Sequence, residues 1–255
     1  MDLPILIYHH LEPDGARLTH CAHSIGRFTA HLDGLKNAGF KTLSFCALFD
    51  ILERGGRVPG KSVLVTFDDG YESFRQLALP ALVKRGMTAT VFVVANEMGG
   101  FNRWDAGSDI PRRELMNDSG LKEILSAGME VGVHGWNHRN LPRCTQSELG
   151  EEIVTAKAHL EQRLGIRTDV FAYPYGYYSK RLFPLLKQTG YRGAVSVFSD
   201  EQTVTSEPFA MRRVPLYEHD NAWRFRFKIS KLYSRYMAWR YRTGGVEDEG
   251  LHQRE

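Results

Sequence analysis

Apolar and polar residues follow one another along the chain in two patterns, one typical of buried strands and the other of helices. Short runs of β-branched and apolar residues predict strands at residues 5–8, 41–45, 62–67, 88–94, 130–134, 170–173, 193–198 and 211–216. Between most of these runs apolar residues recur at helical spacing, as at Phe28, Leu32 and Leu35. The stretch from Thr145 has the same spacing, and Thr145 with Glu148 fits a capping box.

The alternation of strands and helices favours a parallel sheet with helical connections, in the α/β class. A length of 255 residues allows such a sheet to close into a barrel within a single domain, and 42% hydrophobic residues can fill its core. We expect about seven to eight parallel strands. Residues 1–220 would form the barrel, residues 221–242 a basic and aromatic helical segment, and residues 243–255 a disordered tail.

Positive charge is concentrated near the C-terminus. The net charge is +3, but residues 212–242 hold nine basic and two acidic residues, a local charge of +7. No nucleic-acid-binding motif accompanies this charge, so we do not expect a nucleic-acid partner. One interpretation is a final helix that closes the barrel with its charges in water. The other is a peripheral contact with a membrane or an acidic polysaccharide through residues 221–242.

The cysteines and the N-terminus bear on the compartment of the protein. Three cysteines are too few and too scattered for a disulfide framework or a Cys-rich zinc site, so we expect free thiols. The apolar stretch after Met1 is far shorter than the roughly 20 residues that span a membrane, and no basic region precedes it. We therefore expect a soluble protein without a signal peptide or transmembrane segment, cytoplasmic or peripherally bound to a membrane.

Carboxylates and imidazoles follow two of the expected strands. Asp68 and Asp69 come after residues 62–67. His134 is the last residue of the run 130–134, and His138 follows four residues later. Two neutral imidazoles and one carboxylate suit a catalytic zinc or a similar metal. The glycine after the two carboxylates permits a sharp turn that can bring both into one pocket. One carboxylate could then bind metal while the other takes a proton from water.

With its Thr-Phe-Asp-Asp-Gly and His-x-x-x-His motifs, the chain resembles the polysaccharide deacetylase, or NodB-homology, family, closest in style to exopolysaccharide and poly-N-acetylglucosamine deacetylases. The resemblance extends from Pro4 to about Leu216 and implies a distorted, TIM-like (β/α) barrel. It implies a metal-dependent hydrolase that removes N-acetyl groups from an N-acetylated polysaccharide or oligosaccharide and releases acetate. The substrate partner would be an N-acetylated glycan, and the carbohydrate metabolism involved would be exopolysaccharide biosynthesis.

The resemblance also assigns roles to the residues of the two motifs. Asp68 would be the general base, and Asp69, His134 and His138 would bind a divalent metal. Zn2+ fits this set best, with Co2+ or Ni2+ as alternatives. For the general acid, His9 at the end of the first strand is preferred over the alternative, His219.

A third family motif, which normally reads Arg-x-Pro-Tyr-Gly or close to it, corresponds to residues 171–176. Pro174 fixes the backbone, Gly176 allows close approach, and the Tyr175 N–H could face the developing oxyanion. Two positions depart from the common family pattern: Gly135 stands in place of a Ser or Thr, and Ala172 in place of an Arg that orients the catalytic Asp.

These two departures leave open which guanidinium orients the catalytic Asp and whether the barrel is active. Arg213, or less favourably Arg212, could supply the guanidinium from another strand. Two other functions remain open. One is a metal-dependent amidohydrolase that acts on a small amide, and the other is a carbohydrate-binding barrel that has lost catalysis.

Overall fold

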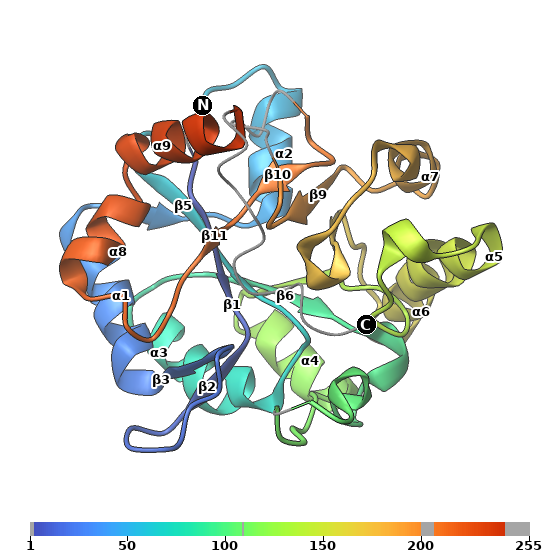
Figure 1. The fold of residues 1–255 in the computed structure, drawn as a ribbon, viewed down its shortest axis with the longest axis horizontal. Coiled ribbons are helices and arrows are strands. Elements are labelled where there is room, and N and C mark those ends of the chain that lie inside the picture. Colours follow the sequence, from blue (N-terminus) through green and yellow to red (C-terminus); the bar gives the residue numbers. More distant parts are fainter. Residues whose placement is uncertain (1–2, 109, 200–206, 243–255) are drawn as a thin grey trace.

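Eight parallel strands form a nearly closed barrel, in the order β10-β9-β8-β7-β6-β5-β1-β11 (Figure 1). A computed structural model describes residues 3–108, 110–199 and 207–242 of the chain. The predicted α/β barrel is confirmed. Its strands are β1 (Ile5–Tyr8), β5 (Ser62–Phe67), β6 (Thr90–Val93), β7 (Glu130–Val133), β8 (Val170–Ala172), β9 (Gly193–Ser196), β10 (Met211–Arg212) and β11 (Val214–Pro215). Short β4 (Lys41–Thr42) pairs with β5, and β2 (His10–Glu12) pairs with β3 (Ala22–Ser24).

The strand predicted at residues 211–216 is divided in two at Arg213. Before this residue β10 pairs with β9, and after it β11 pairs with β1. The Arg213 N–H still donates to the Ser196 carbonyl on the β9 side, at 2.8 Å. The chain therefore changes partner within one short segment, and this segment joins the two ends of the barrel.

Helices surround the barrel and connect most of its strands (Figure 1). They are α1 (Ile25–Asn37), α2 (Phe45–Glu53), α3 (Leu79–Val83), α4 (Asp118–Ser126), α5 (Gln146–Leu149), α6 (Ala156–Leu164), α7 (Phe183–Gln188), α8 (Ala222–Lys228) and α9 (Lys231–Arg242). The predicted capping box of Thr145 and Glu148 is present at the start of α5. The helix expected to continue from there is interrupted by a π-helical turn, η5 (Gly150–Thr155), before α6 begins.

The apolar core has two parts that follow from the alternation of side chains along each strand. One lies between the strands and the surrounding helices, and Leu6, Val65 and Val133 belong to it. The other contains the alternate side chains of the strands together with residues of α2, and these are Ile5, Leu64, Phe92, Val170, Val195, Met211, Phe45 and Phe49. Apolar residues thus fill the inside of the barrel, and the polar residues come at the carboxyl ends of the strands.

The first residue of β7 fixes α2 at the amino end of the barrel. The Glu130 carboxylate accepts the backbone N–H groups of Phe45 and Cys46, each at 2.8 Å. A carboxylate at a helix N-terminus also interacts favourably with the helix dipole. The amino end of the barrel is therefore closed by α2, which leaves the carboxyl ends of the strands for chemistry.

The C-terminal segment, which the sequence predicts to be helical, contains two helices, α8 and α9. The Phe225 ring of α8 stacks on His31 of α1, with 4.3 Å between ring centroids. The Tyr241 hydroxyl of α9 donates to the Val197 carbonyl after β9, at 3.3 Å.

The tail predicted at residues 243–255 lies outside the described residues. No helix among the described residues is long and apolar enough to cross a membrane. Cys21, Cys46 and Cys144 form no disulfide with one another, as predicted.

Candidate active site

Asp68 and Asp69 reach the same place through a tight turn at the end of β5. Asp68 continues the alternation of Leu64 and Thr66, whose side chains face the inside of the barrel. Asp69 has φ of 73° and Gly70 has φ of 76°, both left-handed. The turn that the sequence predicted at Gly70 thus begins one residue earlier. This turn brings both carboxylates to the inside of the barrel, although they are neighbours in sequence.

His134 and His138 face the two carboxylates from the end of β7. The Nδ1 of His134 lies 2.8 Å from the Ala172 carbonyl, which accepts its proton and fixes the tautomer. Its Nε2 lies 3.5 Å from Asp69 and 3.6 Å from Asp68. The Nε2 of His138 lies 3.5 Å from the same Asp69 oxygen, Oδ1.

Asp69, His134 and His138 have a donor set that fits a divalent cation. Each offers one ligand atom, and these atoms lie within 4.8 Å of one another. The buried Oδ1 of Asp69 has no hydrogen-bond donor among the residues that the structure describes. Burial lowers the pKa of both histidines, so the imidazoles are neutral and able to bind metal. Burial and the charge of Asp68 raise the pKa of Asp69 well above its usual value, so this carboxylate needs a positive charge nearby to stay ionised.

Asp68 forms a two-pronged ion pair with Arg213. The distances are 2.5 Å from Nη1 to Oδ1 and 2.7 Å from Nη2 to Oδ2, and both side chains are buried. Burial alone would raise the pKa of Asp68, but the charge of Arg213 holds it well below its usual range. Arg212 instead directs its Nη2 to the Ser234 carbonyl of α9, at 3.4 Å. Of the two arginines considered from the sequence, it is Arg213 that contacts Asp68.

The two candidate general acids lie in different surroundings. His9 follows β1, and the pairing of Tyr8 with Phe67 puts it beside Asp68. Burial lowers the pKa of His9 to about 4, while the charge of Asp68 acts in the opposite direction. His219 is exposed, and its ring stacks on Tyr217 with 5.3 Å between centroids. The position of His9 suits proton transfer near Asp68, whereas His219 lies at the surface.

The loop after β8 adds an aromatic ring to the site. Tyr175 has φ of 60°, and its ring centroid lies 4.5 Å from that of His138. Gly176 has φ of 75°, and a Cβ there would come within 2.7 Å of Val197. Pro174 is buried. The Trp104 ring centroid lies 4.7 Å from that of His138, so two aromatic rings lie close to this histidine.

Left-handed backbone is concentrated in this site. Among the described residues, the non-glycine positions with positive φ are Lys61, Asp69, His138 and Tyr175. Three of these four belong to the cluster just described. Such conformations cost about 1–3 kcal/mol each and are retained at functional sites when the surrounding structure holds them in place. The strained backbone is therefore a second, independent indication that this cluster is a functional site.

Glu152 of η5 also supports the site, and our sequence interpretation missed it. Its buried carboxylate accepts the backbone N–H groups of Trp136 at 2.9 Å and Asn137 at 3.0 Å, within the loop between the two histidines. A sequence signal was available, because Glu152 lies beside Leu149 and Ile153 on the apolar face of the predicted helix. An acidic residue at such a position needs buried partners.

A nearly closed (β/α) barrel that brings two imidazoles and two carboxylates together at the carboxyl ends of its strands defines a hydrolase of the metal-binding type. Comparison with known families matches residues 55–194 to the polysaccharide deacetylases. That match covers more than half of the chain, and the chain belongs to the polysaccharide deacetylase family.

Individual relatives agree with this assignment. A Bacillus subtilis protein assigned by name to the polysaccharide deacetylases is 26% identical over 212 residues, or 83% of this chain and 70% of the relative. The poly-β-1,6-N-acetyl-D-glucosamine N-deacetylase of Staphylococcus aureus is 24% identical over 200 residues, or 75% of this chain and 66% of the relative.

Solved structures share the fold. A Streptococcus pyogenes deacetylase in complex with acetate has a TM-score of 0.78 at 21% identity, and the match covers 90% of this chain and 99% of that one. IcaB from Ammonifex degensii has a TM-score of 0.71 at 24% identity, with 93% and 97% covered. The distorted barrel is thus the fold of this family.

Proposed function

We propose that the chain is a metal-dependent hydrolase that removes N-acetyl groups from an N-acetylated polysaccharide or oligosaccharide and releases acetate. The cluster of Asp69, His134 and His138 beside the Asp68–Arg213 pair carries this proposal. The name of the Staphylococcus aureus relative supports poly-β-1,6-linked N-acetylglucosamine as the first substrate class to examine.

Asp69, His134 and His138 would hold a divalent cation, for which Zn2+ fits the ligand set best and Co2+ or Ni2+ would also serve. When bound, the cation would supply Lewis acidity to water and to the acetyl carbonyl. Asp68 would accept a proton from the water whose oxygen attacks the acetyl carbon. Arg213 would keep Asp68 ionised and oriented toward that water.

Two further groups would complete the reaction. The Tyr175 N–H, in the backbone set by Pro174 and Gly176, would stabilise the negative charge on the acetyl oxygen. His9 would give a proton to the amine nitrogen as the carbon–nitrogen bond breaks. Because burial lowers the pKa of His9 to about 4, this imidazole has to gain its proton during the reaction. The proton that Asp68 takes from the water would pass to His9, which would leave Asp68 ionised again beside the charged imidazole.

Each departure from the family pattern has a compensating contact, which favours an enzyme over a barrel that only binds carbohydrate. Arg213 provides the guanidinium that Ala172 lacks. Glu152 provides the hydrogen bonds to the histidine loop that Gly135 lacks. A binding protein has no physical need for this buried ion pair, whose assembly requires desolvation of two charges.

Acetate release from poly-β-1,6-N-acetylglucosamine oligomers tests the proposal. Protein stripped of metal should release none, and added zinc, cobalt or nickel should restore release. Asp68→Asn should bind metal yet release no acetate, whereas Asp33→Asn, an exposed carboxylate on α1, should behave as the parent. Full activity of Asp68→Asn would overturn the catalytic assignment. Metal binding without acetate from any oligomer would instead direct attention to a small amide substrate.

We also infer that residues 221–242 contact a negatively charged partner, either a membrane surface or an acidic polysaccharide. This segment contains seven basic residues and no acidic ones.

A further inference from the structure

Large apolar side chains are exposed on α8 and α9. Trp223, Leu232 and Trp239 are 75%, 65% and 61% exposed, and Tyr236 is 42% exposed. Together with Phe227 we call these residues the aromatic face. Single exposed apolar residues are ordinary in folded proteins, but a continuous group marks a surface that meets a partner.

The aromatic face is continuous across both helices. The centroids of Trp223 and Phe227 are 6.3 Å apart within α8, and those of Phe227 and Tyr236 are 6.3 Å apart between the helices. Within α9, Tyr236 and Trp239 are again 6.3 Å apart. Four rings therefore form a single row, and the two helices present it together.

The opposite side of the two helices faces the barrel. Phe225, Ile229 and Ala238 are buried. A Cβ at Gly34 of α1 would lie 3.2 Å from the Phe225 ring, so α8 and α1 approach closely. Lys228 donates to the Pro215 carbonyl of β11 and to Asp220. The helices are thus attached to the barrel by one side, and both lie on the side of the molecule away from α5 (Figure 1).

Positive charge accompanies the aromatic face. Among the basic residues of the segment whose side chains are described, Arg224, Arg226, Lys231 and Arg235 are exposed. We propose that the aromatic face docks on an anionic membrane surface, with α8 and α9 lying in the headgroup region. Trp and Tyr side chains favour that depth, and each basic residue near an anionic bilayer strengthens binding.

Charge and apolar exposure together favour a membrane over an acidic polymer or a second copy of the chain. A second copy on a twofold axis would bring the basic residues of both copies against one another. An acidic polymer would be held by the basic residues alone, and the exposed Trp223 and Leu232 side chains would contribute nothing to its binding. A bilayer interface uses both features at once. The proposal goes beyond the hydrolase activity and does not depend on it.

Sedimentation of the full chain with lipid vesicles tests the proposal. The protein should pellet with vesicles of phosphatidylcholine and phosphatidylserine, and pelleting with phosphatidylcholine alone should be far weaker. Added salt should weaken the binding, because exposed charges are screened. The double variant Arg224→Gln, Arg235→Gln should lose about fivefold in partitioning for each charge removed. The variant Trp223→Ser, Leu232→Ser should also lose binding.

Exposed residues elsewhere provide matched controls. Val83→Ser removes an apolar side chain that is 53% exposed on α3, and Lys122→Gln removes an exposed charge on α4. Both should bind vesicles as the parent does. All variants should keep the parent's circular dichroism and its activity on short soluble oligomers, which separates this test from that of the hydrolase.

Three outcomes would overturn the proposal. One is failure to pellet with either kind of vesicle. The second is binding to soluble dextran sulfate without binding to vesicles, which would indicate an acidic polymer. The third is self-association in analytical ultracentrifugation that Trp223→Ser, Leu232→Ser abolishes, which would indicate a second copy.

Discussion

The Glu152 carboxylate lies where a side chain at position 135 would be, and Gly135 leaves that space to it. A Cβ at position 135 would overlap the Oε2 of Glu152, and Gly135 has a left-handed φ of 82°. The Glu152 carboxylate fills this space and accepts the N–H groups of Trp136 and Asn137. The loop between the two histidines is therefore held by a carboxylate from η5 instead of by a side chain at position 135.

Glu152→Ala should weaken both the fold and the metal site. It leaves two partly buried backbone N–H groups without their acceptor, at a cost of about 1–3 kcal/mol in the free energy of unfolding. Because these groups orient the loop that carries His134 and His138, zinc affinity should fall about 10–100-fold. Urea unfolding and zinc titration measure the two effects.

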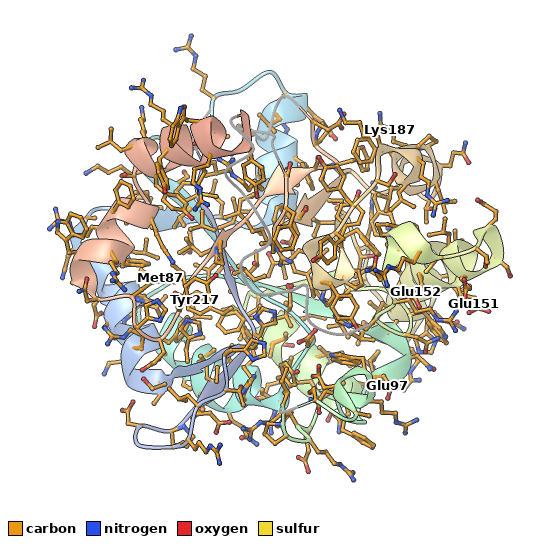
Figure 2. The ribbon with its side chains drawn as sticks, viewed as in Figure 1. Met87, Glu97, Glu151, Glu152, Lys187 and Tyr217 are labelled. Atoms are coloured by element: carbon orange, nitrogen blue, oxygen red, sulfur yellow. The ribbon has the colours of Figure 1, made fainter. Side chains whose placement is uncertain are left out.

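The neighbouring glutamate offers a control for that variant. Glu151 is exposed while Glu152 is buried, and Figure 2 shows Glu151 at the outer edge of the molecule. Glu151→Ala should leave stability and zinc affinity near those of the parent. Equal effects of the two variants would show that general loss of charge, rather than the contact with the loop, is responsible.

Gly135→Ser should be destabilising in the parent and less so beside Glu152→Ala. The serine meets both the left-handed backbone and the Glu152 carboxylate, and only the second of these disappears in the double variant. An interaction energy of at least about 0.5 kcal/mol is expected from the double-mutant cycle in urea unfolding. If the changes in the free energy of unfolding from the two substitutions were strictly additive, a side chain at position 135 would not be in conflict with the Glu152 carboxylate.

Arg213→Met should be strongly destabilising because it leaves Asp68 buried without its counter-charge. Removal of one partner from a buried ion pair typically costs about 3–5 kcal/mol. Addition of Asp68→Asn should recover part of the loss, since no uncompensated charge then remains. The midpoint of urea unfolding reports both changes.

Arg212 serves as the control for this prediction. It is the adjacent arginine, half-buried, and its Nη2 donates to the Ser234 carbonyl. Arg212→Met should lower the free energy of unfolding by less than Arg213→Met. If the double variant at Asp68 and Arg213 were no more stable than Arg213→Met, the ion pair would not be the cause.

The barrel and the metal cluster could be predicted from sequence because each has a local signal. Every strand of the barrel falls within a predicted run, and Asp68 with Asp69 ends one of these runs. The supporting contacts could not be predicted in the same way, since they join residues far apart in the chain. Asp68 and Arg213 meet across 145 positions, and only the closure of the barrel by residues 211–215 brings them together.

The π-helical turn and the divided strand also have no pattern in the sequence. Apolar spacing predicted one helix from Thr145, but η5 inserts a wider turn that carries Glu152. Such turns are frequent at functional sites and are set by tertiary contacts rather than by propensity. Likewise, residues 211–216 read as one strand, and the change of partner at Arg213 depends on two other strands.

Acid should destabilise the protein through buried histidines near β1. Burial lowers the pKa of His23 from 6.5 to about 3 and that of His31 to about 4. In the unfolded chain both would bind a proton below their usual pKa, so the unfolded state gains protons first as the pH falls. Stability should therefore be full above pH 6.5 and decline below it, until the folded pKa is reached.

His23→Leu tests this pH dependence at one residue. Both ring nitrogens of His23 are buried and have no hydrogen-bond partner in the described part of the chain, so leucine loses no hydrogen bond seen there. The variant should remove roughly 2–3 kcal/mol of the acid-induced loss between neutral pH and about pH 4. Urea unfolding at several pH values measures the slope. The exposed His219, replaced by Leu, should leave that slope unchanged.

Removal of divalent metal should lower the thermal stability of the protein as well as its activity. Asp69, His134 and His138 converge only in the folded chain, so a cation that they bind stabilises the folded state alone. At a metal concentration about a thousandfold above Kd, the gain is about 4 kcal/mol. Calorimetry with and without a chelator should show this shift, and Asp69→Asn or His134→Gln should abolish it.

Asp68→Asn should keep the shift and yet release no acetate, while His219→Gln should resemble the parent in both assays. An unchanged Tm on chelation, with acetate release intact, would rule out this cluster as the metal site.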